Sequence, residues 1–401
     1  MKILIRKLEE IADVIAGQSP PSTTYNDKGE GLPFFQGKTD FGKKHPTTRI
    51  WCSEPKKIAL PNDILISVRA PVGPVNIANK KSCIGRGLSA IRPKGGNSLD
   101  FIFYFLKSNE RLIAKNASGS TFIAITQKDL KEIKIPIPER LEDQIRIANI
   151  LSRAEALIAK RQESIQLLDE LLISEFNQRF FKIEQPIEKL ENLTTKITDG
   201  EHKKPEYIEK GLPFISVVNI TKGFLDFNNC KFVSAEDYEK FTKRCNPEVG
   251  DILYTKVGAT YGRAVVVDSD RHFCLYVSVA LLKVDHSKIN SKFLKFAINH
   301  PFVKRQADKS IKGAGVPDLH LIEIKKFKIP FPKKDLQEKF ARIVEKVENM
   351  KTKNQESLQE LENLYASLSQ KAFKGELDLS KMEIEKERLD IAAEDGVGYG
   401  E

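Results

Sequence analysis

Apolar residues recur in alternating steps of four and three along residues 141–179. Neither Gly nor Pro occurs between residues 139 and 185, which is long for one globular helix. The seam consists of Ile147, Leu151, Ala154, Ile158, Arg161, Ile165, Leu168 and Leu172. A heptad seam of this kind predicts a long helix that buries one stripe of side chains against a partner helix.

A second segment of the same chain repeats this pattern. Adding 193 to each seam position gives Phe340, Val344, Val347, Lys351, Asn354, Leu358, Leu361 and Tyr365. The tripeptide QES at 162–164 recurs at 355–357, and the lead-in KIPIP at 134–138 recurs as KIPFP at 328–332. Two unrelated amphipathic helices are the alternative, but the shared tripeptide and proline pair favour an internal repeat.

Short β-rich runs separated by polar loops fill residues 1–138. The runs at 32–35, 64–68, 75–78 and 88–91 predict strands, and 101–106 predicts a short buried helix. Residues 183–332 repeat the plan, because GLPF at 31–34 recurs at 211–214 and NDIL at 62–65 recurs as GDIL at 250–253. The small-residue loop at 119–121 has its counterpart at 313–315. The offset drifts between these landmarks, as expected for two related domains with different loops.

These patterns predict an α+β fold: two similar α/β domains joined by two long helices that pack as an antiparallel coiled coil, with an internal pseudo-two-fold. The predicted segments are domain 1 (1–138), helix 1 (139–182), domain 2 (183–332), helix 2 (333–378) and an acidic tail (379–401). The helices are expected to be antiparallel because domain 2 is entered from the end of one and left at the start of the other. Arg161 and Asn354 are then matched polar residues at mid-seam, where they are expected to set the register.

Composition narrows the function classes. A chain of 401 residues exceeds one ordinary core, and its net charge of +10 suits a polyanionic partner. The five cysteines are odd in number and widely spaced, which favours reduced thiols over disulfides or a metal knuckle. No signal peptide or membrane-spanning run is visible in the sequence.

Catalytic motifs are missing from the sequence. Lys38 follows a glycine as in a phosphate loop, but Leu32 stands where that loop needs glycine. Asp318 and Glu323 with Lys325 resemble a nuclease site faintly, yet lie too close together in sequence for its usual hairpin. No adenine-methylating tetrapeptide, methyl-donor loop or metal-binding cluster is present. We therefore expect binding surfaces and no catalysis by this chain alone.

The repeated plan resembles the DNA specificity subunit of a type I restriction-modification system. The resemblance covers roughly residues 1–377. It rests on the GLPF and Gly/Asn-Asp-Ile-Leu landmarks, on the Ile-Pro-x-Pro segments, and on a glutamine near the start of each long helix, Gln144 and Gln337. Asn62, where the second copy has Gly250, and the polar mid-seam depart from the pattern.

The resemblance implies a function and partners. Each domain would be a target-recognition domain that reads one half of a bipartite site in double-stranded DNA, and the helices would set the spacing and dock two modification subunits. Those subunits would methylate adenine with S-adenosylmethionine, so no cofactor is expected on this chain, and a motor restriction subunit would cut DNA. The resemblance also implies a prokaryotic, cytoplasmic protein.

Candidate DNA contacts are chosen by chemistry alone, since the family's recognition domains vary. Arg and Lys neutralise phosphate or bond guanine, while Asn and Gln suit adenine. The expected contacts are Gln36, Lys38, Lys43, Lys44, Arg69, Lys80, Lys81 and Arg86 in domain 1, and Lys203, Lys204, Asn219, Lys222, Lys256, Tyr261 and Arg263 in domain 2. For each one singly, a solvated surface charge is an equal alternative.

Two other function classes stay open. One is a methyltransferase or nuclease that acts alone, which the missing motifs disfavour. The other is a coiled-coil adaptor between proteins, without any role in DNA recognition. Salt-dependent binding to DNA distinguishes the adaptor from a specificity subunit.

Overall fold

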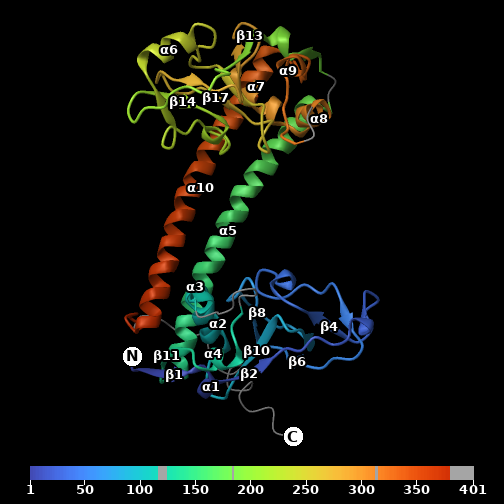
Figure 1. Ribbon diagram of the computed structural model, residues 1–401, viewed down its shortest axis with the longest axis vertical. Coiled ribbons are helices and arrows are strands. Elements are labelled where there is room, and N and C mark those ends of the chain that lie inside the picture. Colours follow the sequence, from blue (N-terminus) through green and yellow to red (C-terminus); the bar gives the residue numbers. More distant parts are fainter. Residues whose placement is uncertain (116–123, 183–184, 312–314, 380–401) are drawn as a thin grey trace. The chain divides into compact units, whose positions relative to one another are not determined.

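The computed structural model describes residues 1–115, 124–182, 185–311 and 315–379. The chain divides into two compact units, shown in Figure 1. Unit 1 comprises Met1–Gln162 together with Glu356–Glu401, and unit 2 comprises Glu163–Gln355. Each unit therefore contains one globular part and half of each long helix.

Unit 1 is built on a four-stranded antiparallel sheet. Its strand order is β2 (Ala12–Ala16), β10 (Leu88–Pro93), β7 (Ile64–Ser67) and β8 (Val75–Ile77). A second sheet has the order β3 (Tyr25–Asn26), β5 (Trp51–Cys52), β4 (Leu32–Phe35), β9 (Ser82–Ile84) and β6 (Ile58–Ala59). Its β4 and β9 are parallel, in contrast to the antiparallel pairing of their other neighbours. The predicted strand runs are confirmed within a residue or two.

The remaining elements of unit 1 connect these sheets to the long helices. They are β1 (Ile3–Lys7), α1 (Leu8–Ile11), η1 (Ser22–Thr24), η2 (Lys38–Asp40), α2 (Leu99–Ser108), α3 (Glu110–Lys115), α4 (Gln127–Lys131) and β11 (Lys134–Pro138). β11 carries the predicted proline lead-in and pairs only with β1, an edge position that tolerates proline.

Unit 2 repeats this topology. Its four-stranded sheet has the order β13 (Thr194–Asp199), β19 (Val279–Val284), β16 (Ile252–Thr255) and β17 (Ala264–Val266), and its three-stranded sheet is β15 (Lys231–Val233), β14 (Leu212–Ile215) and β18 (Cys274–Leu275). The other elements are β12 (Ile187–Lys189), η3 (Leu190–Leu193), η4 (Val217–Asn219), α6 (Ala235–Thr242), α7 (Ser291–Asn299), α8 (Pro301–Ser310), α9 (Leu321–Lys325) and β20 (Lys328–Pro330). The repeat inferred from the sequence is thus confirmed in the fold.

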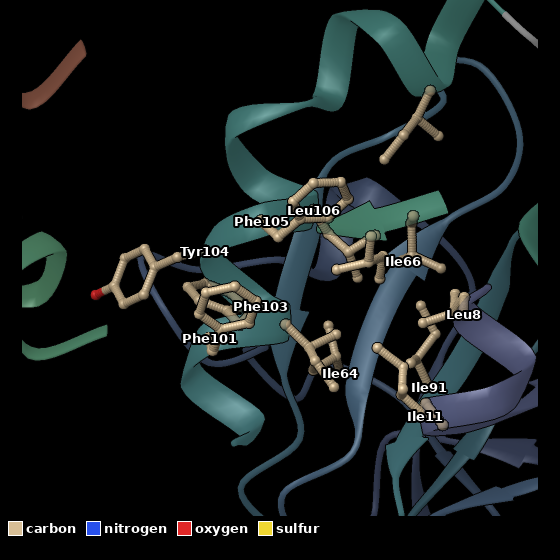
Figure 2. Close-up of a cluster of buried hydrophobic side chains, with 14 of the residues drawn as sticks. Leu8, Ile11, Ile64, Ile66, Ile91, Phe101, Phe103, Tyr104, Phe105 and Leu106 are labelled. Carbon is tan, nitrogen blue, oxygen red and sulfur yellow. The ribbon is translucent and has the colours of Figure 1, made fainter. Parts of the chain in front are cut away.

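The core of unit 1 lies between the four-stranded sheet and α2. Figure 2 shows Ile64 of the sheet on the side of Phe101 and Phe103 of α2, and Ile91 beside Leu8 and Ile11 of α1. Burying each such side chain is worth roughly 1.5–3 kcal/mol, so this face holds the unit together. Ser98 caps α2 by accepting a hydrogen bond from the amide of Phe101 at 3.3 Å.

The two long helices are α5 (Leu141–Phe180) and α10 (Lys334–Lys374). Within unit 2, Lys351 is ion-paired with Asp169, and farther along α5 the ring of Phe176 lies 5.3 Å from that of Phe340. The residue numbers on α10 fall from 351 to 340 as those on α5 rise from 169 to 176, so the two segments are antiparallel there. Within unit 1 the matched segments share one core, which includes Ile147, Leu151, Tyr365, Leu368 and Ala372.

A buried glutamine in the first turn of each long helix joins that helix to its globular part. The Gln144 carbonyl accepts from the amide of Ser98 at 2.8 Å, and its amide group donates to the carbonyl of Pro138 at 3.0 Å. Gln337 makes the equivalent bonds to Asn290 (2.9 Å) and Pro332 (2.8 Å). One side chain therefore connects the long helix, the cap of a core helix and the end of the proline lead-in. We call each arrangement a glutamine clamp.

Parts of the predicted loops and of the tail are not among the described residues. The small-residue loops at 119–121 and 313–314 lie outside the described residues, as does most of the tail. The first tail residue, Leu379, is buried against the core of unit 1, so the acidic extension begins after it. Arg161 belongs to unit 1 and Asn354 to unit 2, and their pairing stays a prediction.

The clamps yield a prediction about stability. Replacing Gln144 with Met keeps its volume but leaves two buried backbone groups without partners, which should lower the free energy of unfolding by about 1–3 kcal/mol. Gln166→Met is the control, since Gln166 is exposed on the same helix and its side chain donates to the exposed Glu170. Urea unfolding of the full chain measures both variants. Equal unfolding midpoints would contradict the role of the clamp.

A second prediction concerns His300, which caps α8 in unit 2. Its Nδ1 accepts from the amide of Phe302 at 3.3 Å, and its ring packs 4.9 Å from that of Phe176. Burial, with a smaller contribution from Arg305, lowers the pKa of His300 to about 4. A protonated Nδ1 cannot accept, so the folded state requires the neutral ring.

The unfolded chain takes up this proton near pH 6.5, above the folded pKa, so the contribution of His300 is complete above that pH. It is lost as pH falls from about 6.5 toward 4. The variant His300→Asn would keep a cap acceptor at this position, and the asparagine side chain does not titrate. We expect the unfolding midpoint to fall less between pH 7 and pH 5 in this variant than in the wild type. The same fall in both proteins would show that His300 does not contribute.

Candidate nucleic-acid interface

Unit 1 carries a hollow of about 540 Å³ at one end of its sheets. Four segments surround it: the loop after β2, the loop after β4, the end of β7 with the loop to β8, and the turn between β9 and β10. Its lining is polar and basic, and consists of Ser19, Gln36, Gly37, Lys38, Thr39, Ser67, Arg69, Ala70, Pro71, Arg86 and Gly87. We call it the arginine cleft. It gathers four of the eight contacts predicted for domain 1: Gln36, Lys38, Arg69 and Arg86.

Hydrogen bonds fix the loop that carries Gln36 and Lys38. The carboxylate of Asp40 accepts from the amides of Gln36 at 2.7 Å and Gly37 at 3.3 Å, and Arg49 pairs with that carboxylate at 2.6 Å. The side chains of Gln36 and Lys38 stay exposed. The buried carboxylate of Asp40 thus shapes the loop, and the exposed ammonium of Lys38 extends from it.

A close backbone approach brings the turn between β9 and β10 against the loop after β4. A Cβ on Gly87 would lie 2.1 Å from the carbonyl oxygen of Gln36, so no residue with a side chain fits at this place. The amide of Gly85 donates to the carbonyl of Phe35 at 2.8 Å beside it. Arg86, between the two glycines, is therefore presented at the edge of the cleft.

Serine hydroxyls hold the backbone of both cleft arginines. Ser19 accepts from the amide of Arg86 at 3.1 Å, and Ser67 donates to the carbonyl of Arg69 at 3.1 Å. Neither guanidinium group has a hydrogen-bond or ion-pair partner in the described part of the chain, and both residues are exposed. They also line an adjoining hollow of about 190 Å³. Fixed backbones with unused guanidinium groups suit a ligand that carries acceptors.

The other predicted contacts of domain 1 lie outside the cleft lining. Lys43 and Lys44 are exposed on the loop bounded by the bridge between Phe41 and Pro46, and Lys44 pairs with Asp100 at 3.4 Å. Two further exposed lysines, Lys80 and Lys81, lie in the connection between β8 and β9. These four residues provide surface charge.

In unit 2 several predicted contacts are exposed but engaged locally. Arg263 donates to the carbonyl of Thr221 at 2.7 Å, and Lys222 pairs with Asp226 at 2.9 Å. The bond from the Asn228 amide, followed by that from Lys222, lowers the pKa of Asp226. The remaining exposed lysines of this set are Lys203 and Lys204, the second of which lies 6.0 Å from the ring of Tyr207.

The half-buried Tyr261 is also engaged. Its hydroxyl donates to the carboxylate of Asp308 at 2.7 Å, and the ammonium of Lys304 lies 4.1 Å from its ring centre. Lys304 first, and then Tyr261, lower the pKa of Asp308. Tyr261 is therefore engaged by two charged residues of α8, Lys304 and Asp308.

Two predicted contacts need correction because they are buried. Asn219 is 3% exposed. Its side-chain oxygen accepts from the backbone amide of Ser216 at 3.0 Å, and its side-chain NH2 group donates to the carbonyl of Asp226 at 3.1 Å. Lys256 is 6% exposed and lies between the carboxylates of Asp199 and Asp318, at 3.4 and 3.7 Å. Both side chains are used inside the unit, so we assign them structural roles.

Sequence reasoning missed the residues that position the arginines. Ser19 and Ser67 resemble ordinary loop and strand residues, and no spacing marks them. Asp40 was hidden within a basic loop, although its position three residues after Gly37 was compatible with a cap. Among the described residues no group of His, Cys, Asp and Glu side chains could hold a metal, and the five cysteines are free.

No helix in the described part of the chain is long and apolar enough to cross a bilayer. The arrangement offers charged loops that extend from a hydrogen-bonded sheet scaffold.

Comparison with known proteins gives a family. The family model for the type I restriction modification DNA specificity domain matches residues 3–168 and again residues 179–363. The two matches together cover most of the chain and coincide with the two copies of the repeat.

Individual relatives agree with this match. A putative type I restriction enzyme MjaX specificity subunit of Methanocaldococcus jannaschii is 48% identical over 162 residues, which are 40% of this chain and 38% of the relative. The MjaIX specificity subunit of the same organism is 24% identical, over 94% of each chain. The chain thus spans well under half of the first relative and nearly all of the second.

A solved structure supports the same fold. The type I restriction-modification S subunit from M. genitalium has a TM-score of 0.59 at 19% identity, and the match covers 95% of this chain and 97% of that one. With the family model matched twice along the sequence, the chain belongs to the family of type I restriction modification DNA specificity proteins.

Proposed function

We propose that this chain is the DNA specificity subunit of a type I restriction-modification complex. Each globular part binds one half of a bipartite site in double-stranded DNA, and the chain itself neither methylates nor cuts. The observation that carries the proposal is the arginine cleft, where two exposed guanidinium groups without partners among the described residues extend from backbones that are fixed by hydrogen bonds.

Charge supports DNA over another ligand. The chain carries a net charge of +10, and the cleft lining contains three basic side chains and no carboxylate. Arginine and lysine contact phosphates and guanine edges, and polar loops on a rigid scaffold are common sites of recognition.

The partners follow from the proposed role. Two modification subunits supply S-adenosylmethionine chemistry for adenine methylation, and a restriction subunit supplies cleavage. The long helices α5 and α10 are proposed as the docking surface for the modification subunits.

The first test is the salt dependence of DNA binding by the full chain. The logarithm of affinity should fall linearly with the logarithm of salt concentration, because bound lysines and arginines displace counterions from phosphates. The double variant Lys43→Ala, Lys44→Ala should reduce the magnitude of this slope by roughly 2 and weaken binding to all sequences. Fluorescence anisotropy with labelled duplexes measures the slope.

The matched control replaces Lys2 and Lys134 with Ala, which removes the same charge from exposed positions at β1 and β11. Its slope should equal that of the wild type. Affinity that is indifferent to salt would favour the adaptor class over the proposed function.

A second test treats the helices as a ruler. Seven residues inserted after Ser164 and seven after Ser357 keep the heptad register and lengthen each helix by about 10 Å. That length corresponds to about three base-pair steps of roughly 3.4 Å each. We expect selection from a library of spacer lengths to return the same half-sites with a spacer longer by about two to four base pairs. An unchanged spacer in a folded protein would reject the ruler.

A further inference from the structure

The backbone hydrogen bonds that surround the arginine cleft in unit 1 have counterparts at the equivalent place in unit 2. The same hydrogen bonds join corresponding loops, so residues can be matched by bonding rather than by sequence. The bond from Gly85 N to Phe35 O (2.8 Å) in unit 1 matches that from Tyr276 N to Ile215 O (2.9 Å) in unit 2. The bond from Val68 N to Gly87 O (2.9 Å) matches that from Lys256 N to Ser278 O (3.0 Å). The bond from Ile125 N to Val68 O (3.0 Å) matches that from Leu319 N to Lys256 O (2.9 Å).

These matched bonds pair each cleft arginine with a valine. Arg69 bridges Ala124 in unit 1, and Val257 makes the same bridge to Asp318 in unit 2. Arg86 follows Gly85, whose counterpart is Tyr276, so Arg86 corresponds to Val277. Both valines are partly exposed, as residues at the edge of a binding surface should be.

Lys256, which precedes Val257, does not supply the positive charge that unit 2 lacks at positions 257 and 277. Lys256 takes the place of Val68, but it is 6% exposed and lies between the carboxylates of Asp199 and Asp318. Asp199 occupies the place of Ala16, because each pairs with the equivalent residue of the neighbouring strand, β19 or β10. Asp318 occupies the place of Ala124, because the two residues form the equivalent bridges to Val257 and Arg69. The charge of Lys256 is thus used internally, and the two valines remain apolar contacts.

We propose that positions 69 and 86 specify guanine in the half-site bound by unit 1, and that their counterparts 257 and 277 specify thymine through its methyl group in the half-site bound by unit 2. This inference rests on the proposed DNA-binding function and names the bases that the site selects.

Base chemistry supports the assignment. A guanidinium group bonds both acceptors of guanine in the major groove, while the C5-methyl group of thymine is the apolar feature there. Ser19 and Ser67 restrict the backbones from which Arg86 and Arg69 extend, which favours a defined base edge over a mobile phosphate contact. A guanidinium group can also bind phosphate alone, and the experiment below separates the two roles.

The experiment selects duplexes from a library randomised in both half-sites, using the full chain. The variants are Arg69→Val, Arg86→Val, Arg86→Gln and Val277→Arg, with far-UV circular dichroism to verify folding. Arg140→Ala is the charge-matched control, because Arg140 is exposed at the start of α5 and lies outside the cleft lining.

The wild type should select guanine at two positions of one half-site. Each Arg→Val variant should lower the preference for guanine at one of these positions by roughly 5- to 150-fold. Arg86→Gln should convert its guanine to adenine, and Val277→Arg should introduce guanine in the other half-site only. Arg140→Ala should leave every preference unchanged. Arg86→Gln keeps the test decisive if an Arg→Val variant folds poorly, because it retains a polar side chain of similar length.

Uniform weakening of binding by the cleft variants, with base preferences unchanged, would make these arginines phosphate contacts and overturn the inference while DNA recognition stands. Failure of the wild type to select any sequence would instead reject the proposed function. The two failures are therefore distinguishable in one experiment.

Discussion

The glutamine clamp is the constraint on which each unit depends. A long helix with exposed polar faces has little reason to leave a globular part in any particular direction. Gln144 and Gln337 remove that freedom, since each side chain is buried and satisfies backbone groups on two other segments. A buried amide that loses one partner is costly, so these bonds favour the helix orientation found in each unit.

Aromatic side chains of the long helices also pack into the core of each globular part. In unit 1 the ring of Phe373 on α10 lies 5.6 Å from Phe101 and 5.2 Å from Phe105 on α2. In unit 2 the ring of Phe340 contacts Phe293 on α7 and Phe180 on α5. Each unit therefore buries part of both long helices in the core of its globular part, and the two rely on the same arrangement of polar anchor and aromatic packing.

Periodicity and repeated landmarks were sufficient to predict the long helices, four strands of unit 1 (β4, β7, β8 and β10) and the duplicated plan, but not the other strands of that unit. Even the departure at Asn62 has a simple account: its φ is 71°, and Gly250 at the matched place has a φ of 93°. Asn is among the few residues with a side chain that tolerate this left-handed conformation, so both sequences fit one turn. Local chemistry of this kind can be inferred from the residue types alone.

The candidate site was only partly predictable. Residue type pointed to Arg69 and Arg86, which line the cleft and stay predicted contacts, but also to Asn219 and Lys256, which are buried. Asn219 is bonded within its own loop, whereas the partners of Lys256 come from distant segments of the chain. A lysine is usually exposed, and nothing near Lys256 in sequence signals that Asp199 lies beside it. Exposure and pairing are set by tertiary contacts, and these are the properties that separate a binding residue from a structural one.

The division of the chain also bears on the order in which it can fold during synthesis. Unit 2 is one continuous stretch, whereas unit 1 needs its first 162 residues and a second segment that begins at Glu356. Phe373, Ala372 and Leu379 complete the core of unit 1 from that second segment. The part that leaves the ribosome first is consequently the last to acquire all of its core, and until then it exposes the apolar side of α2 that Phe373 covers.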